Sequence, residues 1–212
     1  ISPNLSGCCS ILDIGVTCLA TFLNERTGHK ANIIDYTFKK RYWKNYLKEK
    51  LNDFKPDVIG ITTTSLFMRY VRMTINEIRR EYSKDVPIVL GGYHATLNPE
   101  SAINEEGVDA IILGEGEYIM SEYLDNLSGG KSLEGITGLW YKKDGNIFRN
   151  AKRPWSENID SMPIPNYDLW EDIDKYFYFI GQLWFMGTRG CPFKCTNCSE
   201  EPMSKAVPGR RF

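Results

Sequence analysis

Histidine is scarce in this sequence, and no fourth cysteine accompanies the three that lie close together near its end. Cys191, Cys195 and Cys198 form that group, whereas the two histidines, His29 and His94, lie far from it. A structural zinc site normally takes four ligands from cysteine and histidine. A closed zinc site made by this segment alone is therefore disfavoured, although zinc or another metal stays an alternative.

Net charge and long apolar runs are also lacking. The 212 residues carry a formal net charge of −1, which gives no overall attraction to nucleic acid or to an anionic membrane. No apolar run reaches the length of a membrane span, and no signal-peptide pattern opens the sequence. Six cysteines without a secretory context predict a reducing compartment, so we expect a cytoplasmic protein.

The three cysteines have the spacing C-x3-C-x2-C inside the segment 187–198. A [4Fe–4S] cluster usually takes four cysteine thiolates, so a compact group of three can hold three irons and leave the fourth open to a substrate or cofactor. Arg189 and Lys194 are expected to put positive charge near the anionic thiolates. Chance clustering is the remaining alternative. The other cysteines are interpreted as small apolar residues: Cys8, Cys9 and Cys18.

Strand and helix patterns alternate along the first part of the chain. The expected strands cover residues 1–4, 30–35, 57–62, 86–90 and 108–113. The expected helices cover residues 11–26 (with Ser10 as N-cap), 42–54, 66–82, 99–105 and 117–127. Short strands that are apolar on both faces and separated by helices belong to a parallel sheet covered on both sides. The sequence therefore predicts an α/β fold with a doubly wound parallel sheet, flavodoxin-like or Rossmann-like.

The pattern changes after this region. Residues 136–141 and 146–149 predict a β-hairpin, 151–165 a proline-rich linker, 167–181 a short helix and loop, and 183–186 a strand. We therefore expect three parts, with residues 1–130 forming the Rossmann-like domain, 131–182 the hairpin and linker, and 183–212 the start of another domain. Because the chain begins without Met and stops soon after Cys198, we expect it to be a fragment.

Ligands of doubly wound sheets bind beyond the carboxyl ends of the strands. The loops expected there are residues 3–9, 62–65, 91–96 and 114–117, and three of them are rich in Gly, Ser or Thr. The candidate ligand-binding residues are Thr62, Thr63, Thr64, Ser65, Gly91, Gly92, His94, Thr96, Gly114, Glu115, Gly116 and Glu117. Structural alternatives are equally open: His94 could brace the glycine turn, the glutamates could favour a helix N-terminus, and the Thr run could cap a helix.

Beyond these patterns, the chain resembles the cobalamin (B12)-binding radical S-adenosylmethionine (SAM) enzymes over nearly its whole length. The resemblance rests on Pro56–Gly60, on Val89–Thr96 with Pro99-Glu100, on Val108-Asp109 with Gly114–Glu117, on Ile136–Leu139, on Met162–Pro165, and on Thr188–Pro192 with Cys195 and Cys198. It implies a B12-binding domain followed by the first strand and cluster loop of a radical SAM (β/α) barrel.

The resemblance also implies a chemistry. Cys191, Cys195 and Cys198 would ligate a [4Fe–4S] cluster, SAM would bind the open iron, and reductive cleavage of SAM would start radical chemistry. Cobalamin would lie on the candidate loops and often pass a methyl group to a small-molecule substrate, with electrons from a flavodoxin- or ferredoxin-type donor. The resemblance assigns no catalytic side chain here, and we expect this fragment alone to be inactive.

Two departures from the family pattern matter. Asn197 stands where the family commonly has an aromatic residue that holds the adenine of SAM. No D-x-H-x-x-G loop follows the first strand, so we expect no histidine bond to cobalt. The competing interpretation is a Rossmann-like scaffold or substrate-docking module that does not bind cobalamin.

Overall fold

Short strands and helices alternate through the first two thirds of the computed structural model, which describes residues 1–6 and 12–209. The helices are α1 (Ile14–Arg26), α2 (Trp43–Phe54), α3 (Met68–Glu81), α4 (Tyr93–Leu97), α5 (Pro99–Ile103), α6 (Glu117–Ser128), α7 (Ile173–Ile180) and α8 (Glu200–Ala206). The strands are β1 (Ile59–Thr62), β2 (Ile88–Gly91), β3 (Ala110–Ile112), β4 (Leu139–Lys143) and β5 (Asn146–Arg149). Single 3-10 turns cover Ser65–Phe67, Ile159–Ser161 and Tyr167–Leu169.

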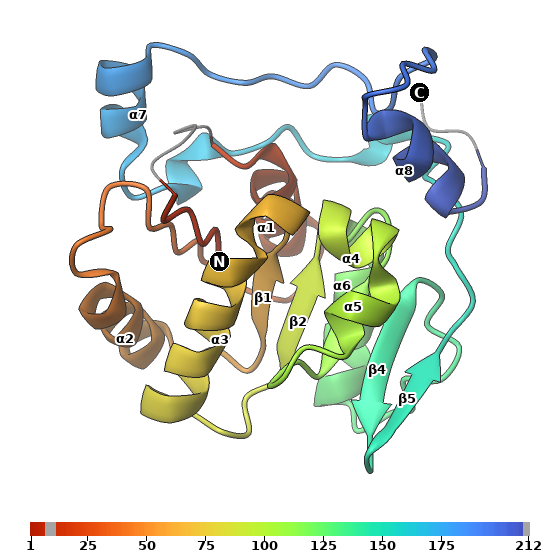
Figure 1. The fold of residues 1–212 in the computed structure, drawn as a ribbon, viewed down its shortest axis with the longest axis horizontal. Coiled ribbons are helices and arrows are strands. Elements are labelled where there is room, and N and C mark those ends of the chain that lie inside the picture. Colours follow the sequence, from red (N-terminus) through yellow and green to blue (C-terminus); the bar gives the residue numbers. More distant parts are fainter. Residues whose placement is uncertain (7–11, 210–212) are drawn as a thin grey trace.

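The strands form one sheet in the order β1-β2-β3-β4-β5 (Figure 1). β1, β2 and β3 pair in parallel, which confirms the expected parallel sheet within the first 127 residues. β4 and β5 form the expected hairpin, but β4 pairs antiparallel with β3. The hairpin therefore extends the sheet as an antiparallel edge, whereas the sequence placed it outside the Rossmann-like domain.

Two further segments continue the sheet beyond β1. The backbone NH of Ser2 donates to the Ile34 carbonyl at 2.9 Å, and the NH of Thr62 donates to the Ile1 carbonyl at 3.1 Å. The five strands expected from the sequence, at residues 1–4, 30–35, 57–62, 86–90 and 108–113, can be numbered 1 to 5 along the chain. In space they lie in the order 2-1-3-4-5. This is the flavodoxin-like order, in which the winding direction switches between the first and third strands. Residues 1–4 and 30–35 were expected as strands, but among the described residues these two segments form a single bridge between Ser2 and Asp35.

Apolar side chains cover both faces of the sheet. Ile111 of β3 packs with α2, α3 and α5 on one face, whereas its neighbour Ile112 packs with α1 and α6 on the other. Leu90 and Val89 of β2 divide between the same two cores. This alternation has the period of two that a strand imposes, so the doubly wound arrangement follows directly from the apolar strands.

Some expected boundaries are wrong. α1 is capped by Asp13, whose carboxylate accepts from the Val16 NH at 3.0 Å, while the expected cap Ser10 lies outside the described residues. The sequence missed α4 and α8, and it expected a strand at 183–186, where the structure has an irregular segment. No described helix is long and apolar enough to span a membrane.

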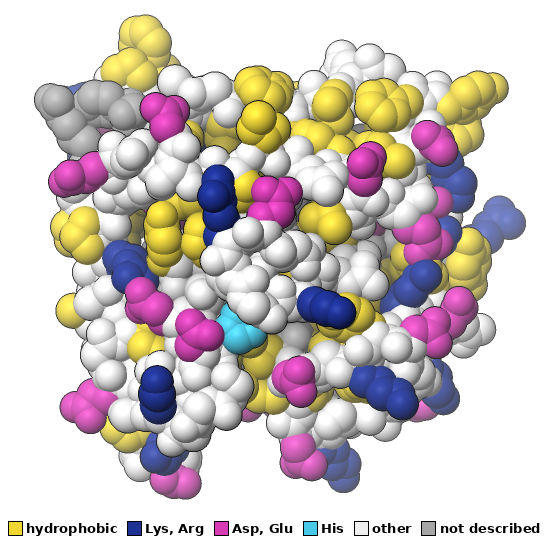
Figure 2. Space-filling view, turned by 180° about the vertical axis from the view of Figure 1, so that it is seen from behind, with side chains coloured by type: hydrophobic (Ala, Val, Ile, Leu, Met, Phe, Trp, Pro, Cys, Tyr) yellow, Lys and Arg dark blue, Asp and Glu magenta, His cyan; other side chains and the backbone are white. Residues whose placement is uncertain are grey.

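The C-terminal third of the chain runs above the carboxyl ends of β1 and β2 (Figure 1). The expected linker 151–165 is anchored, because Trp155 is only 4% exposed and packs with Met203 and Val207. Hydrophobic side chains gather along this upper edge of the molecule (Figure 2). The exposed large apolar residues of the segment 177–193 are Phe177, Tyr178, Phe179, Leu183, Trp184, Phe185 and Phe193.

Candidate functional site

Thr63 joins the loops that follow β1 and β2. Its NH and its hydroxyl both donate to the Gly91 carbonyl, at 2.8 and 2.7 Å. Its carbonyl accepts from the His94 NH at 3.1 Å, and its hydroxyl oxygen accepts from the Ala95 NH at 3.2 Å. The structure therefore brings Thr63, Gly91 and His94 together, as the sequence predicts. Thr63 itself is only 1% exposed, and its hydrogen bonds hold the two loops together.

Gly92, one of the candidate ligand-binding residues, has protein atoms around the position that a Cβ would take. With φ of +94° and ψ of −165°, it adopts a conformation that essentially only glycine reaches. A Cβ atom there would lie 2.9 Å from the Thr63 carbonyl oxygen. Gly92 therefore lets the β1 and β2 loops pack against each other.

Thr96 connects the β2 loop to the β3 loop. Its hydroxyl donates to the Gly92 carbonyl at 2.9 Å and accepts from the Gly114 NH at 3.0 Å. A Cβ atom at Gly114 would lie 3.3 Å from the Trp155 ring and 3.5 Å from Val207. The loop after β3 is thus covered at Gly114, although we expected an open surface there.

Two buried polar atoms at the loops after β1 and β2 have no hydrogen-bond partner among the described residues. They are the Thr64 hydroxyl and His94 Nε2. The other ring nitrogen of His94, Nδ1, lies 2.9 Å from the Ser65 hydroxyl, so His94 also braces the turn after Thr64. Burial lowers the pKa of His94, which favours the neutral ring. Both orphaned atoms suit the amide groups of a polar ligand, so this part of the edge fits cobalamin better than the part at Gly114.

The predicted cluster cysteines lie on an irregular loop. Cys191 is half-buried, and Cys195 and Cys198 are exposed. The Cys198 NH donates to the Cys195 carbonyl at 3.2 Å. Three thiols on one short loop suit an iron–sulfur cluster by donor type. Within residues 1–6 and 12–209, however, no three Cys, His, Asp or Glu side chains are gathered closely enough to hold a metal ion, so the geometry of such a site is not formed here.

Arg189, two residues before Cys191, pairs with two glutamates of the loop after β3. Its guanidinium lies between Glu115 and Glu117, at 3.0 Å from Glu115 Oε1 and 2.5 Å from Glu117 Oε1. These two charges raise the pKa of Arg189 even though burial opposes the rise. The sequence analysis singled out Arg189, Glu115 and Glu117, but no sequence pattern indicated that the arginine pairs with the two glutamates more than 70 positions away.

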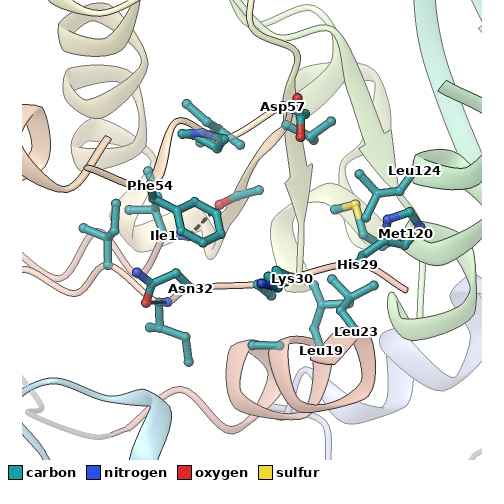
Figure 3. A pocket seen from close by; sticks show the side chains of 18 of the residues that line it. Ile1, Leu19, Leu23, His29, Lys30, Asn32, Phe54, Asp57, Met120 and Leu124 are labelled. Atoms are coloured by element: carbon teal, nitrogen blue, oxygen red, sulfur yellow. Dashed lines mark hydrogen bonds between the residues drawn. The ribbon is translucent and has the colours of Figure 1, made fainter. Parts of the chain in front are cut away.

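A cavity of about 500 Å³ lies at the opposite edge of the sheet (Figure 3). Its walls come from α1, α6, the segment 28–34 and the chain that enters β1. Ile1 lies on this cavity, and its amino group donates to the Gly60 carbonyl at 2.5 Å. None of the predicted ligand-binding residues lines this cavity.

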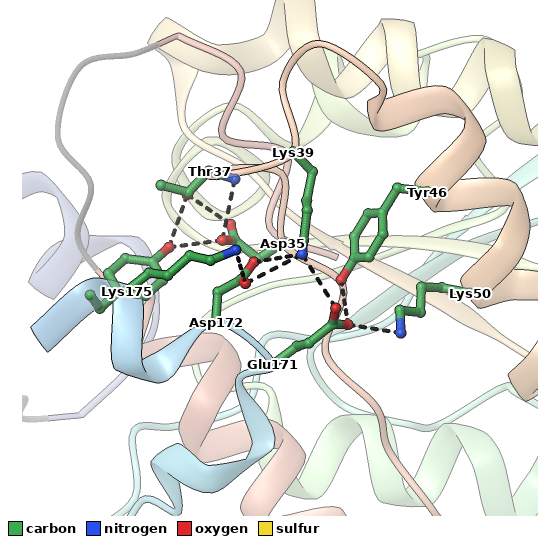
Figure 4. Close-up of polar contacts among 9 residues, drawn as sticks. Asp35, Thr37, Lys39, Tyr46, Lys50, Glu171, Asp172 and Lys175 are labelled. Carbon is green, nitrogen blue, oxygen red and sulfur yellow. Dashed lines mark hydrogen bonds and ion pairs between the residues drawn. The ribbon is translucent and has the colours of Figure 1, made fainter. Parts of the chain in front are cut away.

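A polar network attaches the segment before α7 to the first half of the chain (Figure 4). Lys39 Nζ lies 3.3 Å from Glu171 Oε1 and 3.1 Å from Asp172 Oδ2. The Tyr46 hydroxyl donates to Glu171 at 3.0 Å, and Lys50 lies 2.8 Å from the same carboxylate. Hydrogen bonds from Lys50, then from Tyr46 and Lys39, hold the pKa of Glu171 at about 2 against the effect of burial.

Asp35 forms the buried end of this network. It accepts from the Tyr176 hydroxyl at 2.8 Å and from the Thr37 hydroxyl at 3.0 Å. Burial raises the pKa of Asp35, and these hydrogen bonds oppose the rise. Every polar group described here has a protein partner, so we interpret the network as a structural attachment and not as a catalytic centre. The sequence had no signal for it, since the partners are 139 and 141 positions apart.

Fold and site together define a flavodoxin-like α/β domain whose ligand edge carries loops rich in Gly and Thr. Residues 10–124 match the family described as B12 binding domain, and the chain belongs to that family. This confirms the resemblance from which the sequence analysis argued.

Named relatives agree with this assignment. An uncharacterized methyltransferase of Pyrococcus horikoshii is 37% identical over 193 residues, which are 88% of this chain and 40% of that protein. The radical SAM methyltransferase TsrM of Kitasatospora setae, solved with cobalamin and a [4Fe–4S] cluster, superposes with a TM-score of 0.74 at 21% identity, covering 100% of this chain and 42% of that one. The cobalamin-dependent SAM radical enzyme OxsB, solved with aqua-cobalamin and SAM, gives a TM-score of 0.68 at 22% identity over 88% of this chain and 26% of that one. The chain therefore spans less than half the length of these proteins.

Proposed function

We propose that this chain is the B12-binding part of a cobalamin-dependent radical SAM methyltransferase. One observation carries the proposal. The cysteine loop lies at the same sheet edge as the loops after β1, β2 and β3, joined there through Arg189, Glu115 and Glu117. A B12-binding edge and a cluster loop that meet at one place suit a reaction needing both groups near one substrate.

Cobalamin would lie over the ends of β1 and β2. Thr64 and His94 supply buried polar atoms there that lack partners among the described residues, and no described atom lies within 4 Å of the place where a Cβ of Gly91 would stand. When bound, cobalamin supplies a cobalt centre that can carry a methyl group. The side chains of this chain would hold its amides and keep water from the edge. No histidine bond to cobalt is expected, since His94 lies in no D-x-H-x-x-G loop.

Cys191, Cys195 and Cys198 would hold the cluster, which supplies the electron for cleaving SAM when it is bound. Three cysteine thiols are suitable ligands for such a cluster, and the similar TsrM structure contains cobalamin and a [4Fe–4S] cluster. Among the described residues of this chain, however, the three thiols do not lie close enough together to hold a metal ion. The exposed aromatic side chains beside the loop support a covering partner or domain, because exposed apolar surface of this kind marks contact regions.

The partners and the cellular setting belong to the same proposal. We expect a small-molecule substrate, an electron donor of the flavodoxin or ferredoxin type, and a reducing cytoplasm. The last of these rests on the cysteine content. The related proteins act on different compounds by name, so the substrate stays open.

The full-length protein provides the test. It should be purified anaerobically, reconstituted with iron and sulfide, and mixed with hydroxocobalamin and SAM. We expect cobalamin absorption bands to survive gel filtration, about four irons per chain, and 5′-deoxyadenosine from SAM on reduction. Cys195→Ala should lose the iron and keep the cobalamin bands. A wild-type protein that retains neither group would contradict the proposal.

A scaffold that does not bind cobalamin is the second candidate. The observation favouring it is the cover that Trp155 and Val207 place over Gly114. The same absorption measurement separates the two functions. A protein that binds iron and cleaves SAM without ever retaining cobalamin would support the scaffold role for this domain.

A further inference from the structure

Arg189 connects the cysteine loop to the loop that follows β3. Its side chain is 12% exposed, and those of Glu115 and Glu117 are 16% and 6% exposed. The guanidinium reaches one oxygen of each carboxylate, at 3.0 and 2.5 Å. The pairing is therefore mostly shielded from water, unlike the exposed ion pairs elsewhere on this chain.

The two glutamates are themselves held in place. The second oxygen of Glu115 accepts from the Ser156 NH at 2.8 Å. Glu117 is the first residue of α6, where the helix dipole favours a carboxylate. The acceptors of the arginine are thus fixed by the B12-binding domain. A planar guanidinium that binds two fixed carboxylates is oriented as well as attracted, which an ammonium group would not be.

Helix α1 also contacts the Arg189 guanidinium, through Cys18. Cys18 of α1 is buried, and burial raises the pKa of its thiol, while the neighbouring Arg189 guanidinium opposes that rise. Removing the arginine would leave two carboxylates facing each other with little solvent between them. Breaking a buried pair by deleting one partner is strongly destabilising for the contact it holds. The arginine is therefore a contact that holds the start of the cysteine loop against the B12-binding domain.

We infer that Arg189 is a positioning residue, whose ion pairs with Glu115 and Glu117 fix the start of the cysteine loop at the carboxyl edge of the sheet. Because Arg189 precedes Cys191 by two residues, fixing the guanidinium limits where the first thiol can lie relative to the loops after β1 and β2. The functional consequence rests on the proposed function, but the contact itself does not. Arg189 would act through the loop, without touching substrate or cofactor.

Hydrogen exchange of the full-length protein without cofactors tests the contact. In Arg189→Ala, amides of residues 187–191 should exchange at least about tenfold faster, while amides of β1–β3 keep their rates. Arg189→Lys should give an intermediate rate. The exchanged pair Arg189→Glu with Glu117→Arg should recover part of the protection. The matched control is Arg72→Ala, since Arg72 makes a two-pronged pair with Glu105 away from this loop.

Unchanged exchange at 187–191 in Arg189→Ala and Arg189→Lys would overturn the inference. If Arg189→Ala fails to fold, the lysine variant and the exchanged pair still give the answer.

A second readout separates this inference from the proposed function. In the reconstituted enzyme, Arg189→Ala should retain cobalamin in equilibrium dialysis as wild type does, with KM for SAM unchanged and kcat at least about tenfold lower. If wild type binds neither cobalamin nor iron, the proposed function fails and the exchange result still stands. If wild type is active and the variant matches it in both exchange and kcat, only the positioning role fails.

Discussion

Replacing Gly92 with alanine should destabilise the domain far more than the same change one residue earlier. The added Cβ would lie 2.9 Å from the Thr63 carbonyl oxygen and 3.2 Å from its nitrogen, closer than real Cβ contacts allow. The backbone conformation alone costs about 1–3 kcal/mol for a residue other than glycine. Moving Thr63 would also strain its hydrogen bonds to Gly91 and His94, each worth about 1 kcal/mol. We expect a total loss of about 3–5 kcal/mol in the free energy of unfolding.

Urea denaturation followed by circular dichroism measures this loss. Gly91→Ala is the matched control, because no atom lies within 4 Å of a Cβ at Gly91 and its φ is not positive. The control should change the free energy of unfolding by less than about 1 kcal/mol. Equal effects of the two substitutions, or a loss below about 1 kcal/mol in Gly92→Ala, would refute the argument that Gly92 serves the packing of the two loops.

Two further outcomes follow from other contacts. Trp155→Ala should release α8, so that trypsin cleaves at Lys205 at least about tenfold faster; an unchanged rate would contradict the anchoring role. Tyr176→Phe removes a donor to buried Asp35 and should cost about 1–3 kcal/mol by urea denaturation, and a cost near zero would show that the network contributes little.

Local sequence patterns were enough to predict the doubly wound sheet. The strand expected at 86–90 and the helix expected at 66–82 differ from β2 and α3 by a few residues at their ends. Strands that are apolar on both faces announce a buried parallel sheet, and this signal needs no knowledge of distant residues. α4 was missed because it has only five residues and directly follows Gly91-Gly92, which resembles an ordinary turn.

The candidate site was only partly accessible to such reasoning. The sequence brought Thr63, Gly91 and His94 to one edge correctly, since parallel strands end at the same side of a sheet. It could not foresee that Trp155 covers Gly114, or that Arg189 pairs with two glutamates. Those contacts join residues 41 to 74 positions apart and depend on how the C-terminal segment folds back, which no local pattern encodes.

β5 forms one edge of the sheet, because it ends the strand order β1-β2-β3-β4-β5. The unpaired backbone groups of an edge strand can pair with a strand of another chain. β5 is short, covering Asn146–Arg149, and Arg149 forms an ion pair with Glu100 at 2.8 Å. Short edge strands that carry charge are a common protection against such pairing. The hairpin that the sequence placed outside the domain therefore protects the edge of β3 from aggregation between copies.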